Sequence, residues 1–258
     1  MLLNPKSRLA PLFERLRIHY AHEHHWWPLH THDRGYEVML GMVLVQQTQW
    51  GTVEAAVLRI LDHGYTSFTT LADADPELLA QLCKPCAFYT RKSNALIRIA
   101  QVVASQPAGF SSLVVGERGV LRESLLALPQ IGRESADTVL MYGGEHPLFI
   151  VDAYARRVLA RTGIYADAID CARAPYDAIQ RIVEADVGEL NISTARELHA
   201  MMVEASIHHC TANNPRCARS GAVRRFVDPR KCKDHCPPCT GCPAADMCVY
   251  HSSVTKLK

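Results

Sequence analysis

The sequence contains no apolar segment long enough to cross a membrane. Its longest unbroken apolar run covers residues 38–45, eight residues, whereas a transmembrane helix needs roughly 20. The first thirty residues also lack the apolar core of a secretion signal. Both absences argue against a membrane-bound or exported protein, so we expect a cytoplasmic protein with no membrane partner.

Strand patterns are also nearly absent. Residues 149–151 are the best short candidate for an extended segment, and no internal repeat or low-complexity segment is present. Elsewhere apolar residues recur at intervals of three and four, the period of an α-helix with one buried face. This periodicity predicts helices over residues 8–22, 36–64, 76–83, 91–105, 118–127, 132–143, 153–162, 176–187 and 193–208. The chain is therefore expected to be all-helical.

The sequence has little net charge, only +2 at pH 7. That charge is unevenly distributed, because residues 208–258 contain nine Lys and Arg against three Asp. A basic segment on an otherwise mildly acidic chain is the pattern expected for contact with a polyanion such as DNA. A solvated surface tail is the alternative interpretation of the same composition.

Cysteine is scarce outside this basic segment. Seven of the ten cysteines lie in the last fifty-one residues. Four of them follow the spacing Cys-x6-Cys-x2-Cys-x5-Cys, namely Cys232, Cys239, Cys242 and Cys248. Four soft thiolates in a short loop-rich segment suit a [4Fe-4S] cluster, in which each iron takes one sulfur ligand. Structural zinc and disulfides are the competing interpretations, and a reducing cytoplasm disfavours disulfides.

The first ligand of such a cluster has two candidates. Cys210 and Cys217 repeat the first interval of the spacing and directly follow a helical stretch. If Cys210 is the first ligand, residues 211–238 form an insertion. If the ligand set is contiguous and begins at Cys232, then Cys217 and Cys236 are left over. We expect the contiguous set.

A second motif covers residues 128–140, Leu-Pro-Gln-Ile-Gly-Arg-Glu-Ser-Ala-Asp-Thr-Val-Leu, where one helix ends, a glycine-bearing turn follows and another helix begins. This stretch resembles a helix-hairpin-helix. Backbone N–H groups of Ile131 and Gly132, the following helix dipole and Arg133 can hold a DNA phosphate without reading sequence. The usual hairpin has glycine at Gln130, so the turn is expected to be reshaped or its grip on DNA weakened.

Asp152 comes shortly after the hairpin's second helix and heads another helical stretch. Together with the hairpin and the cysteines, it makes nearly the whole chain resemble the helix-hairpin-helix DNA glycosylases related to endonuclease III. An aspartate at this place is catalytic in that superfamily, so the resemblance implies that Asp152 stabilises an oxocarbenium-like sugar and orients the attacking water. A helix N-cap is the alternative role, and one carboxylate can fill both.

Two further site residues follow from the resemblance. Gln46, in a Leu-x-Gln-x-Thr segment, matches the glutamine that enters the space left by the flipped base. A hydrogen bond at a helix end is the alternative for Gln46. Glu134 occupies the place of the lysine that opens the strand in bifunctional members, and a carboxylate cannot form the required Schiff base. The resemblance therefore implies excision by water, with Glu134 lining the lesion pocket.

The words Gly-x-Glu-Ser-Ala-Asp at residues 132–137 and His-Trp-Trp-Pro at residues 25–28 are similar to the methylpurine branch, whose substrates are alkylated purines such as 3-methyladenine. The resemblance implies an all-α, two-lobed glycosylase with a DNA cleft between the lobes. We expect a six-helix lobe over residues 34–147 and a second lobe, with the cluster segment, over residues 1–33 and 148–258.

The expected activity is monofunctional excision of damaged bases from double-stranded DNA by a nucleoid-associated monomer that carries a [4Fe-4S] cluster. Two alternatives stay open. One is an oxidised-pyrimidine glycosylase of the endonuclease III type with weak or lost lyase activity. The other is a DNA-binding iron-sulfur sensor with little catalysis, which the departures at Gln130 and Glu134 would suit.

Overall fold

The computed structural model describes residues 3–20, 27–213, 215, 217 and 241–255. Every regular element in these ranges is helical, and the described part of the chain contains no strand. None of the described helices combines the length and apolarity that crossing a membrane requires. The all-helical prediction is confirmed.

The chain divides into two compact units, which we call unit 1 (Met1–Trp26 and Pro147–Lys258) and unit 2 (Trp27–His146). Unit 2 is formed by one continuous segment, whereas unit 1 brings the two ends of the chain together. The predicted lobes had their boundaries at residues 34 and 147. Each unit is described separately below.

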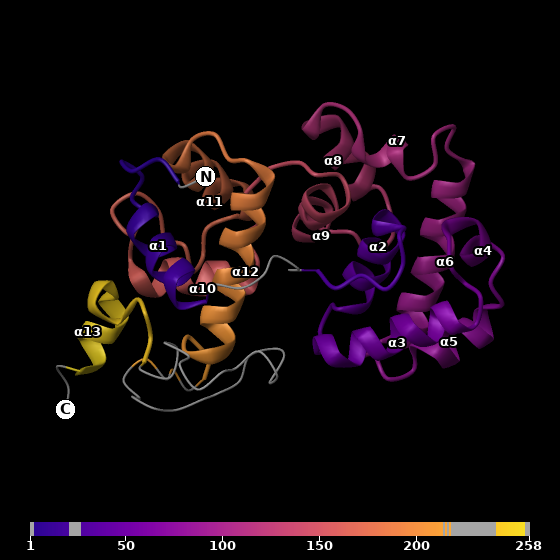
Figure 1. Cartoon of the computed structure of the whole chain (residues 1–258), viewed down its shortest axis with the longest axis horizontal. Helices are drawn as coiled ribbons and strands as arrows, with labels where there is room; N and C mark the ends of the chain where they lie inside the picture. Colours follow the sequence, from indigo (N-terminus) through magenta and orange to yellow (C-terminus); the bar gives the residue numbers. More distant parts are fainter. Residues whose placement is uncertain (1–2, 21–26, 214, 216, 218–240, 256–258) are drawn as a thin grey trace. The chain divides into compact units, whose positions relative to one another are not determined.

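Unit 2 is built around a buried central helix, α2, which packs against α3, α6, α9 and the π-helix η1 (Figure 1). Ten of its residues are buried, as the apolar sequence on nearly every side of this helix predicts. Asp33 caps its start by accepting a hydrogen bond from the Tyr36 backbone N–H. The elements of this unit are α2 (Arg34–Leu44), α3 (Trp50–Asp62), α4 (Phe68–Ala72), α5 (Pro76–Cys83), α6 (Tyr89–Ser105), α7 (Ser111–Val114), α8 (Arg118–Leu126), α9 (Arg133–Thr138) and η1 (Val139–Gly143).

The helical period over residues 36–64 covers two helices, and the loop between them contains the Gln46 segment that was expected to close the first helix. The helix ends at Leu44, and α3 begins at Trp50. In between, Gln47 adopts a left-handed backbone conformation, with φ of 54°, which a right-handed helix cannot contain. The apolar period continues through the break because both helices bury side chains in the same core. Periodicity alone therefore did not reveal the break.

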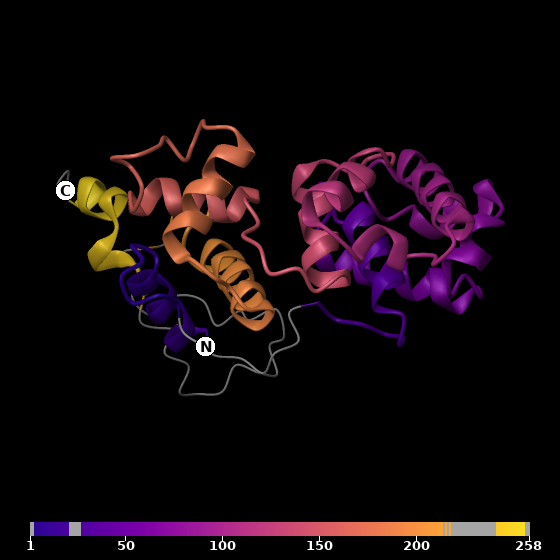
Figure 2. The same cartoon turned by 90° about the horizontal axis from the view of Figure 1, so that it is seen from above.

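Unit 1 is held by a pair of packed helices, α10 and α12 (Figure 2). The amino-terminal helix α1 packs on α12, and the carboxy-terminal helix α13 packs on α10. Leu12, Leu16, Val158, Leu198 and Met202 belong to their common apolar core. The elements of this unit are α1 (Ala10–His19), α10 (Ala153–Thr162), α11 (Tyr176–Val187), α12 (Ile192–His208), the short 3-10 helix η4 (Ala245–Met247) and α13 (Val249–Thr255).

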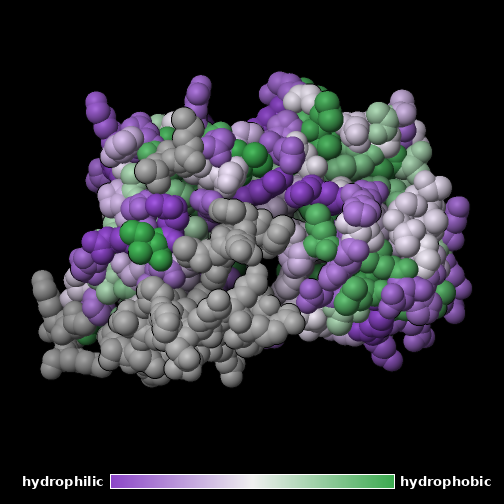
Figure 3. Space-filling view, viewed as in Figure 1, coloured by the Kyte–Doolittle hydropathy of each residue, from purple (hydrophilic) through white to green (hydrophobic). Residues whose placement is uncertain are grey.

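Residues 149–151 form no strand, contrary to the sequence-based suggestion. Phe149 is bonded to side chains instead: its N–H donates to the Glu184 carboxylate over 2.9 Å, and its carbonyl accepts from Gln180 over 2.8 Å. The buried segment therefore satisfies its backbone groups through α11 rather than through a sheet. On the face shown in Figure 3, apolar side chains are interspersed with hydrophilic ones.

Candidate functional site

Asp152 is the N-cap of α10 and is buried, with 6% of its surface exposed. One carboxylate oxygen accepts a hydrogen bond from the Ala155 backbone N–H over 2.6 Å. The other lies 3.5 Å from Nε2 of His199 on α12. The N-cap role is confirmed, and it leaves the second oxygen oriented by an imidazole. His199 carried no signal in the sequence, because only the packing of α12 on α10 brings it here.

The hairpin joins α8 to α9, and Gln130 lies in its turn with φ of 63°. This is the left-handed region that glycine adopts most easily, so the turn keeps a glycine-like backbone although the residue is glutamine. The Gln130 side-chain amide donates to the Arg91 carbonyl over 3.2 Å. The expected reshaping of the turn is therefore not observed.

The start of α9 follows this turn directly. Gly132 is the N-cap of this helix and has no side chain that could accept from the first N–H groups. Gly132, Arg133 and Glu134 are all exposed, whereas Ile131 is buried and its N–H donates over 3.4 Å to the Leu128 carbonyl inside the turn. Gly132 and Arg133 are thus better placed than Ile131 to meet an anion.

A buried ion pair fixes the angle between the hairpin helices. Asp137 of α9 is fully buried, and its carboxylate lies 2.9 Å from Nη2 of Arg122 on α8. A buried charge of this kind needs its partner, since an unpaired carboxylate in the interior is strongly destabilising. Asp137 was not singled out by sequence reasoning, although it ends the Gly-x-Glu-Ser-Ala-Asp word.

Gln46 lies just beyond the end of α2, in the loop of residues 45–49. Its side-chain Nε2 donates to the Gln130 carbonyl over 2.8 Å. Two segments that the sequence analysis selected independently are therefore bonded to each other inside unit 2. The alternative prediction, a glutamine hydrogen bond at a helix end, describes this contact in part.

Aromatic side chains gather beside the same end of α2. The Trp27 ring lies 5.1 Å from that of Trp50, edge to face, and 5.2 Å from that of Tyr142. A Cβ added at Gly41 would lie 2.7 Å from the Trp27 ring, so glycine is required for this approach. The group is only partly buried at Trp27 and Trp50, which leaves ring surface exposed.

Phe88 precedes α6 and was not predicted as a site residue. Its side chain is 63% exposed, although it is large and apolar, and its backbone is left-handed with φ of 56°. A bulky residue in this conformation is strained, and such strain gathers at functional positions. The neighbouring Ala87 N–H donates to the Thr48 hydroxyl, which ties this exposed residue to the loop of Gln46.

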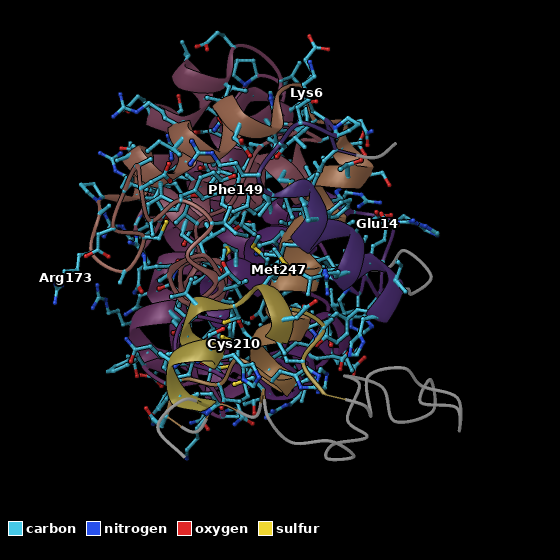
Figure 4. The ribbon with its side chains drawn as sticks, turned by 90° about the vertical axis from the view of Figure 1, so that its left-hand side faces the viewer. Lys6, Glu14, Phe149, Arg173, Cys210 and Met247 are labelled. Carbon is cyan, nitrogen blue, oxygen red and sulfur yellow. The ribbon has the colours of Figure 1, made fainter. Side chains whose placement is uncertain are left out.

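Cysteines from three parts of the sequence line one pocket in unit 1. They are Cys210, Cys217, Cys242 and Cys248, beside apolar side chains of α1, α10 and α12. Figure 4 shows Cys210 close to the ribbon of the carboxy-terminal segment. Cys232 and Cys239, the other members of the predicted ligand set, lie outside the described residues, as does Cys236. No group of three or more His, Cys, Asp or Glu in the described ranges could hold a single metal ion.

Two arginines of α10 support this pocket. Nε of Arg157 donates to the Cys210 carbonyl over 2.6 Å. Nη1 of Arg161 lies 3.3 Å from Sγ of Cys210 and donates to the Thr211 carbonyl over 2.8 Å. The helix that Asp152 caps at its start therefore holds the cysteine segment at its end.

Burial raises the pKa of two pocket thiols. The pKa of Cys242 rises to about 12, and that of Cys248 also rises. Backbone N–H groups oppose this effect, because Ala244 is bonded to the Cys242 sulfur and both Tyr250 and His251 to the Cys248 sulfur. Hydrogen bonds of this kind stabilise a sulfur that carries negative charge, as a metal-bound thiolate does.

A buried cluster of rings lies next to the cysteine segment. His19 and His209 have ring centroids 5.7 Å apart, and Tyr20 lies between α1 and the end of α12 with no exposed surface. Burial, with a smaller effect of the His208 charge, lowers the pKa of His19 to about 4. His19 is therefore a core residue of unit 1.

Comparison with known families matches residues 40–186 to the HhH-GPD superfamily of base excision DNA repair proteins. A Methanocaldococcus jannaschii protein with the provisional name DNA repair glycosylase is 27% identical over 91% of this chain and 95% of its own length. Endonuclease III of Thermotoga maritima is 28% identical over 73% of this chain and 80% of its own length.

Solved structures share the fold. A complex of endonuclease III with DNA superposes with a TM-score of 0.72 at 17% identity, covering 98% of this chain and all of the other. A 3-methyladenine DNA glycosylase of H. pylori gives a TM-score of 0.59 at 22% identity, covering 76% of this chain and 96% of the other. The chain belongs to the HhH-GPD superfamily and is a base excision repair DNA glycosylase.

Proposed function

We propose that this glycosylase hydrolyses the N-glycosidic bond of alkylated purines in double-stranded DNA and leaves the resulting abasic strand uncut. The observation that carries the proposal is the environment of Asp152. Its carboxylate is buried, fixed through one oxygen as a helix cap, and close to His199 through the other. A preorganised carboxylate stabilises positive charge that develops on the sugar and orients the attacking water.

The absence of lyase chemistry follows from the groups around the hairpin. Glu134 occupies the lysine position and is exposed on the first turn of α9. Lys92 of α6 contacts the Gln46 loop, but it is buried, and its ammonium donates to three oxygens at the end of α2 and in that loop. Neither residue offers an accessible amine that could attack the sugar and form a Schiff base.

The aromatic group of Trp27, Trp50 and Tyr142 supports alkylated purines as the substrate class. Alkylation of a purine ring nitrogen makes the base cationic, and aromatic faces attract cations. Trp27, Trp50 and Tyr142 form such a surface. Phe88, the residue before α6, adds an exposed ring. The fold does not choose the lesion, since endonuclease III and a 3-methyladenine glycosylase both share it.

The proposed contacts to DNA are made to the phosphate backbone and do not depend on the base sequence. The exposed backbone of Gly132, the start of α9 and the Arg133 side chain suit a phosphate. Gln46 is the residue that fills the gap left by the flipped nucleotide. Gln130 contributes its left-handed turn and its carbonyl rather than a direct grip.

Duplexes that each carry one defined lesion test this function. The lesions are an alkylated purine, uracil and an oxidised pyrimidine, and each product is analysed with and without alkali. We expect strand cleavage for the alkylated purine, and only after alkali. Cleavage without alkali would refute the monofunctional mechanism, and excision only of an oxidised pyrimidine would refute the substrate class. Binding without any excision would favour the sensor alternative.

We further propose that unit 1 binds a [4Fe-4S] cluster through Cys210, Cys217, Cys242 and Cys248. These thiols line one pocket and fit the group, because a cluster takes one thiolate per iron and its ligands need not converge on one point. Two of the three expected intervals are also present, Cys210-x6-Cys217 and Cys242-x5-Cys248, with residues 218–241 inserted between the second and third ligands. The bound cluster would supply iron–sulfur bonds that fix these segments.

Single substitutions separate this ligand set from the contiguous one. Cys217→Ser and Cys232→Ser are compared by iron and acid-labile sulfide content and by visible absorbance of the purified proteins. The pocket predicts loss of cluster in Cys217→Ser and a full cluster in Cys232→Ser. The reverse result would restore the contiguous set. Cys171→Ser, a buried cysteine of unit 1 outside the pocket, is the matched control.

A further inference from the structure

Lys92 is a fully buried lysine in the first turn of α6, with 1% of its surface exposed. Its Nζ donates to the Leu44 carbonyl over 2.8 Å, to the Gln46 carbonyl over 2.6 Å and to the Thr48 hydroxyl over 3.0 Å. An ammonium has three N–H donors, so these three oxygens use all of them. All three acceptors belong to the end of α2 and the loop after it.

Core packing does not account for this residue. Burying an ammonium is costly, and here burial lowers the pKa of Lys92. An apolar side chain of similar length would fill the same space without that cost. What an apolar side chain cannot do is hold three oxygens of an irregular loop in one arrangement.

The loop that Lys92 holds is joined to the hairpin. The Gln46 amide donates to the Gln130 carbonyl, and the Gln130 amide donates back to the Arg91 carbonyl, next to Lys92. The three segments thus close a ring of hydrogen bonds within unit 2. Gln47 and Gln130 in this ring are left-handed, at φ of 54° and 63°. Strained backbone of this kind persists only where its surroundings fix it.

We infer that Lys92 is a positioning residue, which holds the loop of Gln46 so that the glutamine stays linked to the hairpin turn and ready to enter the duplex. The inference rests on the proposed function, in which Gln46 occupies the gap left by the flipped nucleotide. Lys92 does not touch the DNA itself. Lys92 acts through the oxygens of the Gln46 loop. Because Gln46 is bonded to the hairpin turn, its insertion is coupled to the turn that precedes α9, whose start is proposed to bind phosphate.

The test compares Lys92→Met with Lys84→Met, an exposed lysine at the end of α5. Nucleotide flipping is read from the fluorescence of 2-aminopurine placed beside the lesion, and excision is measured under single-turnover conditions. We expect Lys92→Met to slow flipping and excision about 10- to 100-fold, the loss typical of a misplaced group. Affinity for undamaged duplex should stay near the wild-type value, and Lys84→Met should match wild type throughout.

A double variant shows whether Lys92 acts through Gln46. In a Gln46→Ala background, Lys92→Met should cost little further excision, because the group that it positions is already gone. Losses that multiply in the double variant would overturn the inference, as would wild-type flipping in Lys92→Met. Lack of excision by the wild-type protein on every lesion would instead refute the proposed function.

A milder variant keeps the inference testable if Lys92→Met fails to fold. Thr48→Val preserves the shape of the side chain and leaves Lys92 in place, but it removes one of the three acceptors. We expect a smaller loss of flipping in the same direction, with melting temperature measured alongside. Unchanged flipping in a folded Thr48→Val protein would also count against the positioning role.

Discussion

The two units hold their functional segments together in opposite ways. In unit 2, the loop of Gln46, the hairpin turn and the start of α6 are joined by hydrogen bonds that the chain itself completes, with Lys92 at the centre. In unit 1, thiols from three parts of the sequence line one pocket. Thiols make only weak hydrogen bonds, so gathering them stabilises the fold little until a metal group bonds them.

Under the proposed cluster, only unit 1 would depend on a cofactor. The hydrogen bonds that join the Gln46 loop, the hairpin turn and the start of α6 form when the chain folds, because these segments supply both donors and acceptors. The proposed cluster would add iron–sulfur bonds to the pocket of unit 1. Four experiments test this difference between the units.

The largest expected effect is that of Asp152→Asn. Asparagine caps helices as well as aspartate does, so α10 should keep its start and the fold its stability. The charge is lost, and excision should fall about 10²- to 10⁴-fold while affinity for DNA is kept. Single-turnover rates and binding isotherms measure the two quantities. Asp167→Asn, which removes an exposed surface charge, is the control.

Asp152→Ala is the companion variant, because it removes the cap as well. It should lose the same activity and also about 1 kcal/mol of stability. Equal activity in wild type and Asp152→Asn would remove Asp152 from the chemistry and leave it as a cap.

Removal of iron should have the next largest effect, and it should fall on unit 1 alone. Treating the purified protein with a chelator and a reductant should raise amide hydrogen exchange about tenfold or more in α10 and α13, equivalent to about 1.4 kcal/mol. Exchange in α2 and α6 should not change, since Lys92 fixes the Gln46 loop without a metal. Equal increases in both units would show that the contrast between them is wrong.

How far the sequence predicted each region follows from the same contrast. Helices over residues 76–83, 153–162 and 176–187 have the predicted bounds, because Pro at a start, an N-cap aspartate or a Gly just past the end is a local signal. Gln46, Gln130 and Asp152 were also found from short local motifs, although their roles stay predictions. The polar Gln46 segment also indicated where the first helix closes, but not that Lys92, nearly fifty residues away, donates to the Leu44 carbonyl there.

The cysteine pocket and His199 illustrate the same limit. Spacing favoured Cys232 as the first ligand, since a contiguous set is the simplest match. Cys232 lies outside the described residues, so that choice stays a prediction; the structure places Cys217 in a pocket with Cys210, whose carbonyl is bonded to α10. His199 meets Asp152 only through helix packing. Both depend on contacts between distant segments, which no local pattern encodes.

A pH effect of intermediate size is expected from His19 in unit 1. Its pKa is about 4 when folded and near 6.5 when unfolded, so the unfolded state binds more protons between these values. The stability that neutral His19 contributes is therefore complete above pH 6.5 and is lost as the pH falls toward 4. Urea unfolding at several pH values measures the slope.

The variant His19→Phe should flatten this part of the pH profile, whereas His63→Phe, at an exposed histidine of unit 2, should not. A profile that His19→Phe leaves unchanged would mean that other groups of unit 1 take up the protons. The comparison also shows whether the acid sensitivity lies in unit 1 or in unit 2.

The smallest expected effect concerns the hydrogen bond from Gln130 to Arg91 and its contribution to the stability of unit 2. Gln130→Gly removes left-handed strain of about 1 kcal/mol but also the side-chain bond to Arg91, worth about the same, so stability should hardly change. Gln130→Ala keeps the strain and loses the bond, and should cost about 1 kcal/mol. Melting temperatures of the two variants decide the matter. Stabilisation by glycine of the full 1 kcal/mol would mean that the bond to Arg91 contributes nothing, and Gln46 would then make the only contributing bond between the hairpin turn and the segments of Gln46 and Arg91.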